Sequence, residues 1–274
     1  MPDWREIPIR DLPPALTRQV HEKIRLHSVT MAVSGGLATE PVCCSGTFVR
    51  INSMAGILTA RHVWTTIERS SRLVLLVGGR PYDVDPSVLR ALGPSDQATL
   101  PEVNAPVPDV TFVRLPPPVC GHIEAYDKVF YSIDIRRQDA QLDLFGEKGF
   151  WILAGSPQVL FDAKSGLVPS FFYDTAVEKR IAFGDWDYLF VNLNLDKNPG
   201  IPRTYGGVSG GGIWRAEFSQ TEDETVFAVK APARDILLCG VAFYQTAAEG
   251  RQILGHGPKS LYETLCKYAI DRVT

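Results

Sequence analysis

The sequence predicts an all-β protein with one helix near each end. Short β-branched and aromatic runs recur between Gly, Pro, Asn and Asp clusters through the middle of the 274-residue chain, which is typical of a sandwich or barrel of many short strands. The 20 prolines and 23 glycines supply turns throughout that region. Helical periodicity is confined to the two ends. A chain of this length can form one large or two small domains.

The predicted elements follow in order. Leu16, Val20 and Ile24 recur at helical spacing and predict an amphipathic helix over residues 13–26. Ser260 and Glu263 have the spacing of a capping box and predict the start of a final helix. Strands are predicted between the two helices, over 28–33, 42–49, 56–59, 73–77, 109–115, 128–133, 150–154, 188–195, 211–218, 225–229 and 236–245.

Composition excludes several classes of protein. The 28 Lys and Arg residues against 31 Asp and Glu give a net charge of −3, which argues against nucleic acid or an anionic membrane as the main partner. No apolar run approaches the ~18–20 residues that span a bilayer. The five cysteines are odd in number and form no CxxC pair, so we expect reduced thiols, no structural metal site and no cofactor. The acidic, proline-containing start favours a cytoplasmic protein over a secreted one.

Three segments carry the residue types that nucleophilic catalysis requires. His62 follows an apolar strand, Asp109 heads an alternating strand, and Ser209 lies in the glycine-rich turn 206–212. Each alone has an ordinary structural explanation, as a polar strand end, a turn cap or a hairpin. Together they supply a weak nucleophile, a base that removes its proton and a carboxylate that orients the base. The amides of Gly207 and Ser209 would then hold the oxyanion.

These segments resemble those of the trypsin-like (chymotrypsin-fold) serine peptidases. The matching stretches are Leu-Thr-Ala-Arg-His ending at His62, Asp-Val-Thr-Phe-Val beginning at Asp109, and Gly-Val-Ser-Gly-Gly around Ser209. The resemblance implies two six-stranded antiparallel β-barrels with the site between them. It implies an N-terminal helical extension over 1–27, a first barrel over 28–118 and a second barrel with the C-terminal helix over 119–274. It also implies hydrolysis of protein or peptide substrates through an acyl-enzyme.

The sequence departs from the family pattern near the serine. Val208 stands where secreted members carry an aspartate, and Val63 replaces the cysteine that closes their histidine loop. We therefore expect an intracellular bacterial-type member whose oxyanion loop is held in another way or is completed by an activating protein partner. Arg203 would favour acidic substrates if it lies at the base of the specificity pocket; alternatively, it is solvated. The strand with Phe243 and Tyr244 would line the substrate channel, without the serine that the family often uses there.

Two alternatives stay open. The Gly-x-Ser-x-Gly pattern around Ser209, followed by Asp235 and His256, also fits an α/β-hydrolase nucleophile elbow. That fold needs a helix after the serine, whereas a strand-like segment follows it. The other alternative is a catalytically silent pseudoprotease that keeps the fold as a protein-binding module.

Overall fold

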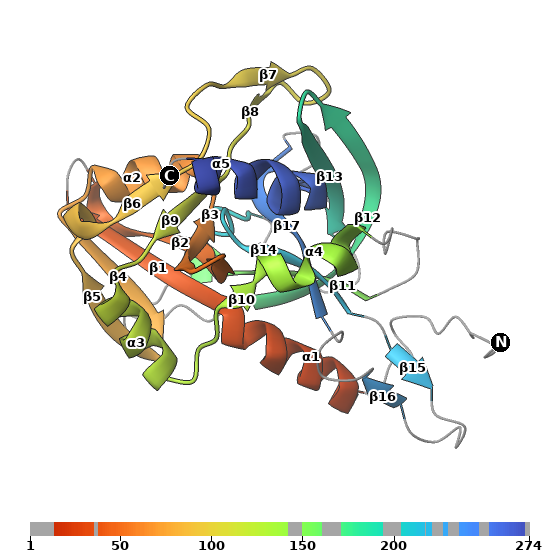
Figure 1. The fold of residues 1–274 in the computed structure, drawn as a ribbon, viewed down its shortest axis with the longest axis horizontal. Helices are drawn as coiled ribbons and strands as arrows, with labels where there is room; N and C mark the ends of the chain where they lie inside the picture. Colours follow the sequence, from red (N-terminus) through yellow and green to blue (C-terminus); the bar gives the residue numbers. More distant parts are fainter. Residues whose placement is uncertain are drawn as a thin grey trace.

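The computed structural model describes residues 14–35, 38–141, 150–160, 171–193, 204–216, 218–220, 227–229, 236–246 and 252–271 of the chain. Two sheets dominate it, one formed by the N-terminal half and one by the C-terminal half (Figure 1). Among the described residues, no helix is both long and apolar enough to cross a membrane.

The N-terminal sheet has eight strands in the order β5-β4-β1-β2-β3-β9-β6, with β10 paired to β2. All the pairings are antiparallel except that of β10, which is parallel. The strands are β1 (Ser28–Gly35), β2 (Ala38–Ile51), β3 (Met54–Thr59), β4 (Arg72–Val77), β5 (Arg80–Val84), β6 (Arg90–Leu92), β9 (Thr111–Arg114) and β10 (Tyr131–Ser132).

The C-terminal sheet is a closed antiparallel barrel in the order β11-β12-β13-β18-β17-β14. Its strands are β11 (Phe150–Gly155), β12 (Phe171–Phe183), β13 (Trp186–Leu193), β14 (Gly212–Ala216), β17 (Ile236–Gln245) and β18 (Gln252–His256). Two small hairpins pair β7 (Ala98–Leu100) with β8 (Ala105–Val107) and β15 (Phe218–Gln220) with β16 (Phe227–Val229).

Figure 1 draws α1 below the two sheets, α2 and α3 beside the N-terminal sheet, and α4 and α5 across the middle of the molecule. Helix α1 contacts β1 and β2 of the first sheet and β17 of the second, so it bridges the two halves. The α-helices are α1 (Pro14–His27), α2 (Arg61–Glu68), α3 (Pro117–Ala125), α4 (Ile133–Gln141) and α5 (Cys266–Asp271). The remaining helical turns are η2 (Pro86–Val88), η3 (Gln158–Leu160) and η5 (Ser260–Leu265), of which η5 is a π-helix that leads into α5.

Two strands at the junction of the two sheets, β3 and β11, are buried along their whole length. Every residue of β3 and β11 is buried, and β3 contacts β17 while β11 contacts β1 and β2. Strands covered on both faces are expected to be apolar throughout rather than alternating, as the sequences MAGILT and FWILAG are. The candidate site residues described below lie at this junction.

The predicted fold class, an all-β chain with two β-units and a helix at each end, is confirmed. The second barrel has the predicted six strands, but the first sheet has eight. The excess arises because β6 and β10, with three and two residues, also pair with the sheet, and such short segments show no alternation. The predicted capping box is wrong, since the Ser260 hydroxyl bonds to the backbone of Asp187.

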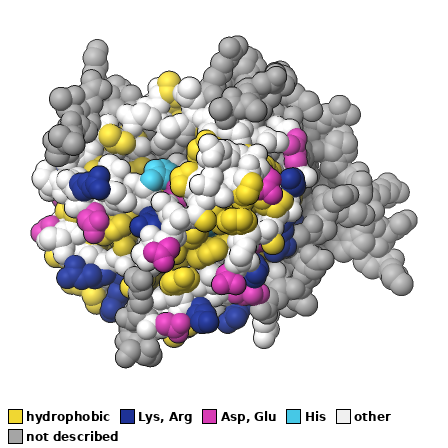
Figure 2. All heavy atoms as spheres, turned by 90° about the horizontal axis from the view of Figure 1, so that it is seen from above, with side chains coloured by type: hydrophobic (Ala, Val, Ile, Leu, Met, Phe, Trp, Pro, Cys, Tyr) yellow, Lys and Arg dark blue, Asp and Glu magenta, His cyan; other side chains and the backbone are white. Residues whose placement is uncertain are grey.

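The surface seen in Figure 2 carries Lys and Arg side chains interspersed with Asp and Glu. No patch of a single sign dominates the described part of this face. Hydrophobic side chains lie between the charges, and one histidine is visible among them.

Candidate active site

His62 and Asp109 form a close pair at the end of β3. The chain leaves this strand at Thr59, and α2 begins at Arg61, so His62 lies in the first helical turn. The backbone N–H of His62 donates to Asp109 Oδ1 at 2.9 Å, and its ring Nδ1 lies 2.6 Å from Oδ2. A carboxylate only accepts, so Nδ1 carries the proton and Nε2 is the free acceptor of the neutral ring. The imidazole is 51% exposed, whereas the Asp109 side chain is 5% exposed.

A second histidine lies behind Asp109. The backbone N–H of Asp109 donates to Nε2 of His256 at 2.9 Å. The His256 ring packs against the rings of Trp186, Tyr188 and Phe243. Burial lowers the pKa of His256 to about 3, although the nearby Asp109 charge opposes this shift. His256 is therefore neutral near pH 7, with its proton on Nδ1, which has no hydrogen-bond partner among the described residues.

Ser209 lies in the tight loop 205–211, which we call the nucleophile loop because Ser209 is the candidate nucleophile. The loop turns at Gly207 and Gly210, whose φ angles are +93° and +89°, values that L side chains rarely adopt. A Cβ at Gly210 would lie 2.0 Å from the carbonyl oxygen of Ser45 and 2.1 Å from Oγ1 of Thr59. The loop therefore packs closely against the strand end that leads to His62.

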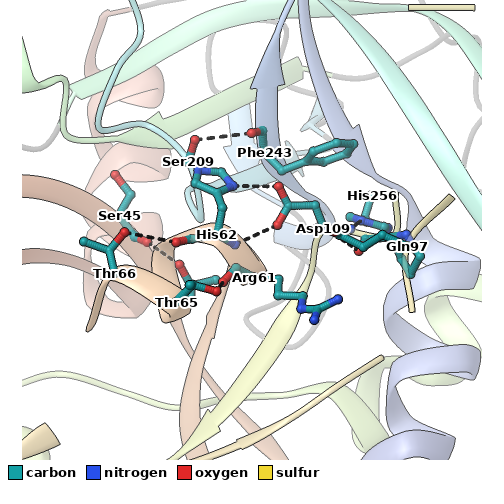
Figure 3. Close-up of polar contacts among 12 residues, drawn as sticks. Ser45, Arg61, His62, Thr65, Thr66, Gln97, Asp109, Ser209, Phe243 and His256 are labelled. Carbon is teal, nitrogen blue, oxygen red and sulfur yellow. Dashed lines mark hydrogen bonds and ion pairs between the residues drawn. The ribbon is translucent and has the colours of Figure 1, made fainter. Parts of the chain in front are cut away.

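The side chain of Ser209 faces the imidazole in the view of Figure 3. Its hydroxyl donates to the carbonyl oxygen of Phe243 at 3.4 Å, a long contact for an O–H donor. Both residues lie in the described part of the chain, and no hydrogen bond joins Ser209 to His62. The structure thus bonds His62 to Asp109, and Figure 3 draws Ser209 next to the His62 ring.

Two peptide groups of the nucleophile loop are oriented by hydrogen bonds to their carbonyls. The carbonyl of Gly206 accepts from Gln158 N at 2.6 Å, and that of Val208 accepts from Gly211 N at 2.8 Å. The C=O and N–H of a trans peptide point in opposite directions. The N–H groups of Gly207 and Ser209 therefore point away from these anchors, and neither has a partner among the described residues.

The remaining residues expected at the site have different surroundings. The Phe243 ring is buried against His256, so only its backbone reaches the serine. Tyr244 is half-buried at the next position of β17. Val208 is buried, and a Cβ at Gly155 would lie 2.8 Å from its Cγ1. Arg203 lies outside the described residues.

Cysteine chemistry does not fit this site. All five cysteines are thiols that form no disulfide. Cys43 lies beside the nucleophile loop, since its carbonyl oxygen lies 3.1 Å from a Cβ placed on Gly207. Burial raises the pKa of its thiol to about 11, so it is protonated at neutral pH and is a poor nucleophile. No cluster of His, Cys, Asp and Glu able to hold a metal ion occurs among the described residues.

The α/β-hydrolase alternative requires His256 to act as the base. That ring is fully buried on β18, and its Nε2 is occupied by the Asp109 amide. The serine is followed by strand β14 rather than by a helix. Asp235, the third residue of that alternative, lies outside the described residues.

Solved structures share this arrangement of two β-units. The Rv3671c protease from M. tuberculosis, in its active form, aligns with a TM-score of 0.53 at 13% identity, covering 98% of this chain and 93% of that chain. GrC aligns with a TM-score of 0.52 at 14% identity, covering 90% and 95%. The chain has the chymotrypsin-like fold. Neither a protein-family model nor a curated protein sequence matches it.

Within the chymotrypsin-like fold, sequence reasoning missed residues that contact the site. Ser45, Gln158 and His256 each bond to the backbone of a site residue or of the nucleophile loop. His256 was considered only as part of the hydrolase alternative. No local pattern marks Ser45 or Gln158, since each partner lies on a distant segment of the chain.

Proposed function

We propose that the protein is a serine endopeptidase that uses Ser209, His62 and Asp109. The observation that carries the proposal is the double hydrogen bond from His62 to the buried Asp109 carboxylate. It directs the unprotonated Nε2 of a half-exposed imidazole away from the carboxylate and toward the side on which Figure 3 draws Ser209. Likeness to solved serine proteases at this level of identity supports the fold, and the activity is inferred from the residues.

The reaction follows from these positions. Ser209 Oγ turns from the Phe243 carbonyl, gives its proton to Nε2 of His62 and forms a bond to the carbonyl carbon of the substrate. His62 passes that proton to the leaving amine as the peptide bond breaks, which leaves an acyl-enzyme. Water then attacks the acyl carbon, with His62 taking its proton and returning it to Ser209 Oγ. Asp109 orients the ring and stabilises the imidazolium in both steps.

The oxyanion hole is assigned to the amides of Gly207 and Ser209. Both N–H groups point away from anchored carbonyls and have no partner among the described residues. A negative oxygen that develops beside the serine would accept from both of them. Preorganised donors of this kind are worth about 10²–10³-fold in rate for each donor.

The substrate class is protein or peptide. If Arg203 lies beneath the bound side chain, it would favour acidic residues before the cleaved bond, and cleavage of a peptide library tests this. Enrichment of Lys or Arg at that position would contradict the assignment. Activation by a protein partner also stays a prediction, tested by comparing activity with and without cell extract.

Labelling with a fluorophosphonate–rhodamine probe tests the proposal, because the probe reacts with activated serines. We expect wild-type protein to be labelled, Ser209→Ala to be unlabelled and His62→Ala to react at least about 10³-fold more slowly. Ser87→Ala, an exposed serine in η2, serves as the matched control and should label normally.

Labelling that survives in Ser209→Ala would refute the assignment of the nucleophile. A folded wild-type protein that resists the probe under all conditions would support the pseudoprotease alternative.

A further inference from the structure

Ser45, on β2 of the first sheet, is bonded directly to the nucleophile loop of the second. Its backbone N–H donates to the carbonyl oxygen of Ser209 at 3.2 Å. Its hydroxyl donates to the carbonyl oxygen of Gly207 at 2.7 Å. One residue of the first sheet thus contacts both residues whose amides form the proposed oxyanion hole.

The hydroxyl of Ser45 is itself held in one orientation. The backbone N–H of Ser156 donates to its oxygen at 2.8 Å, and the hydroxyl of Ser156 shares a hydrogen bond with that of Thr30. Ser45, Ser156 and Thr30 are all buried. A hydroxyl has one proton, so once its oxygen accepts from Ser156, that proton is directed at Gly207.

Gly207 is consequently anchored on both sides. The carbonyl before it accepts from Gln158 N, and its own carbonyl accepts from Ser45 Oγ. A glycine with φ of +93° has no side chain that would resist rotation of the adjoining peptide. Without these anchors, the peptide between Gly206 and Gly207 could turn its carbonyl into the oxyanion hole, which would remove one donor.

The nucleophile loop has no charged residue next to Ser209 that could anchor it by an ion pair. The preceding residue is Val208, whose side chain is buried and cannot carry a charge. Among the described residues, the groups that hold the loop are hydroxyls, amides and carbonyls, none of which titrates between about pH 4 and pH 9.

We infer that Ser45 is a positioning residue that keeps the oxyanion hole assembled through neutral hydrogen bonds across the two sheets. This inference rests on the proposed serine peptidase function. It makes assembly of the hole independent of pH and of any ion pair at the position before the nucleophile. In this view the oxyanion loop is held in another way than by a partner, and a protein partner that activates the enzyme would act on a different part of the site.

Ser260 provides a matched control for Ser45. Its hydroxyl also donates to a buried carbonyl, that of Asp187 at 2.8 Å, and accepts from a buried amide, that of Asp187 at 2.9 Å. Ser260→Ala therefore removes the same kind of bonds as Ser45→Ala, at a site that does not contact the nucleophile loop. Both variants should be less stable to urea, because Ser45→Ala leaves the Ser156 amide and the half-buried Gly207 carbonyl without their hydroxyl partner, and Ser260→Ala leaves the Asp187 amide without its acceptor. The Asp187 carbonyl keeps its hydrogen bond from Gly257 N at 2.8 Å.

The readout is the second-order rate of labelling by fluorophosphonate–rhodamine, whose phosphonyl oxygen occupies the oxyanion hole. We expect Ser45→Ala to react at least about tenfold more slowly than wild type, by the same factor at pH 6 and pH 9. Ser260→Ala should react within about twofold of wild type. Should Ser45→Ala not fold, Thr59→Val, which removes the hydroxyl bonded to the Ser45 carbonyl without changing side-chain shape, should show a smaller slowing.

The outcomes separate the two proposals. Wild-type labelling that depends on Ser209, together with an unchanged rate in Ser45→Ala, overturns the role of Ser45 alone. Equal slowing in Ser45→Ala and Ser260→Ala also overturns it, because the effect would then be one of general stability. Absence of Ser209-dependent labelling in the wild type overturns the proposed function itself.

Discussion

Asp109 meets a histidine on each of its two sides, and the two histidines differ in almost every property. On the solvent side, the half-exposed His62 bonds to the carboxylate through both its backbone N–H and its ring. On the interior side, the fully buried His256 accepts from the backbone N–H of the same aspartate. His62 therefore bonds to the charged carboxylate of Asp109, whereas His256 bonds to the backbone of Asp109.

The difference shows how burial divides the work between identical side chains. Desolvation lowers the pKa of His256 to about 3, so this ring keeps one protonation state near neutrality and can only position its neighbour. His62 remains open to solvent and bonded to a carboxylate, which suits a group that gains and loses a proton. The fold thus separates the ring proposed for proton transfer from the ring that supports it.

Replacing Asp109 by Asn should have the largest effect on the labelling rate, because it removes the negative charge that contacts the half-exposed His62. The amide would present an N–H to Nδ1 and favour the tautomer with its proton on Nε2, which cannot act as a base. We expect the fluorophosphonate labelling rate at neutral pH to fall about 10⁴-fold. A fall of less than tenfold would mean that His62 does not depend on the carboxylate. Asp96→Asn, an exposed aspartate, is the control.

Acid should destabilise the folded protein because the buried His256 is held in its neutral form. The folded-state pKa of His256, about 3, lies below the ordinary value of 6.5, so between these values the unfolded chain binds a proton that the folded chain does not. The free energy of unfolding therefore falls as pH falls through this range, by about 1.4 kcal/mol per pH unit from this group. Urea unfolding at several pH values measures the slope.

His256→Gln should remove that contribution. Between about pH 6.5 and pH 5, we expect the wild type to lose about 2 kcal/mol more unfolding free energy than the variant. His27, whose pKa burial lowers to about 4, remains in both proteins and adds the same acid sensitivity to each. Parallel pH profiles in the two proteins would contradict the burial of a neutral His256.

The smallest expected effect concerns positioning by the interior histidine. His256→Leu removes the acceptor for the Asp109 amide, which leaves that N–H buried and lets the aspartate shift. We expect the labelling rate to fall about tenfold, a cost of about 1.4 kcal/mol. His256→Gln keeps an acceptor and should recover most of the rate. If both variants match the wild type, the interior contact has no role in positioning Asp109.

The sequence could predict the parts of the site that lie in short local motifs. The residues around each candidate predict the element that holds it. His62 follows an apolar strand, Asp109 begins an alternating strand, and Ser209 lies in a glycine turn. The α1 helix was also predictable, because its buried residues Leu16 and Val20 recur at helical spacing.

Two elements near the site, strand β12 and helix α2, could not be predicted from the sequence pattern. Strand β12 has thirteen residues and was missed, because a register shift between Val177 and Lys179 interrupts its pairing with β13. Charged residues of this strand also disrupt the apolar pattern. Helix α2 was missed because the apolar run of β3 leads into His62 with only Ala60 between the strand and the helix, without a side-chain cap.

The supporting residues could not be found from local pattern at all. The contact between Ser45 and Gly207 joins residues 162 positions apart, and that between Asp109 and His256 joins residues 147 positions apart. Ser45 and His256 lie on strands that carry other polar residues as well, so only the packing of the two sheets reveals their partners.

The hydrogen bonds between Ser45 and the nucleophile loop have a further consequence. Each half of the chain carries part of the proposed chemistry, and the contacts that shape the loop cross from one half to the other. A fragment with only one half would carry either a base without a nucleophile or a nucleophile without a base. Peptidase activity would therefore report whether the halves are docked, so two separately expressed fragments could act as a sensor of their own reassociation.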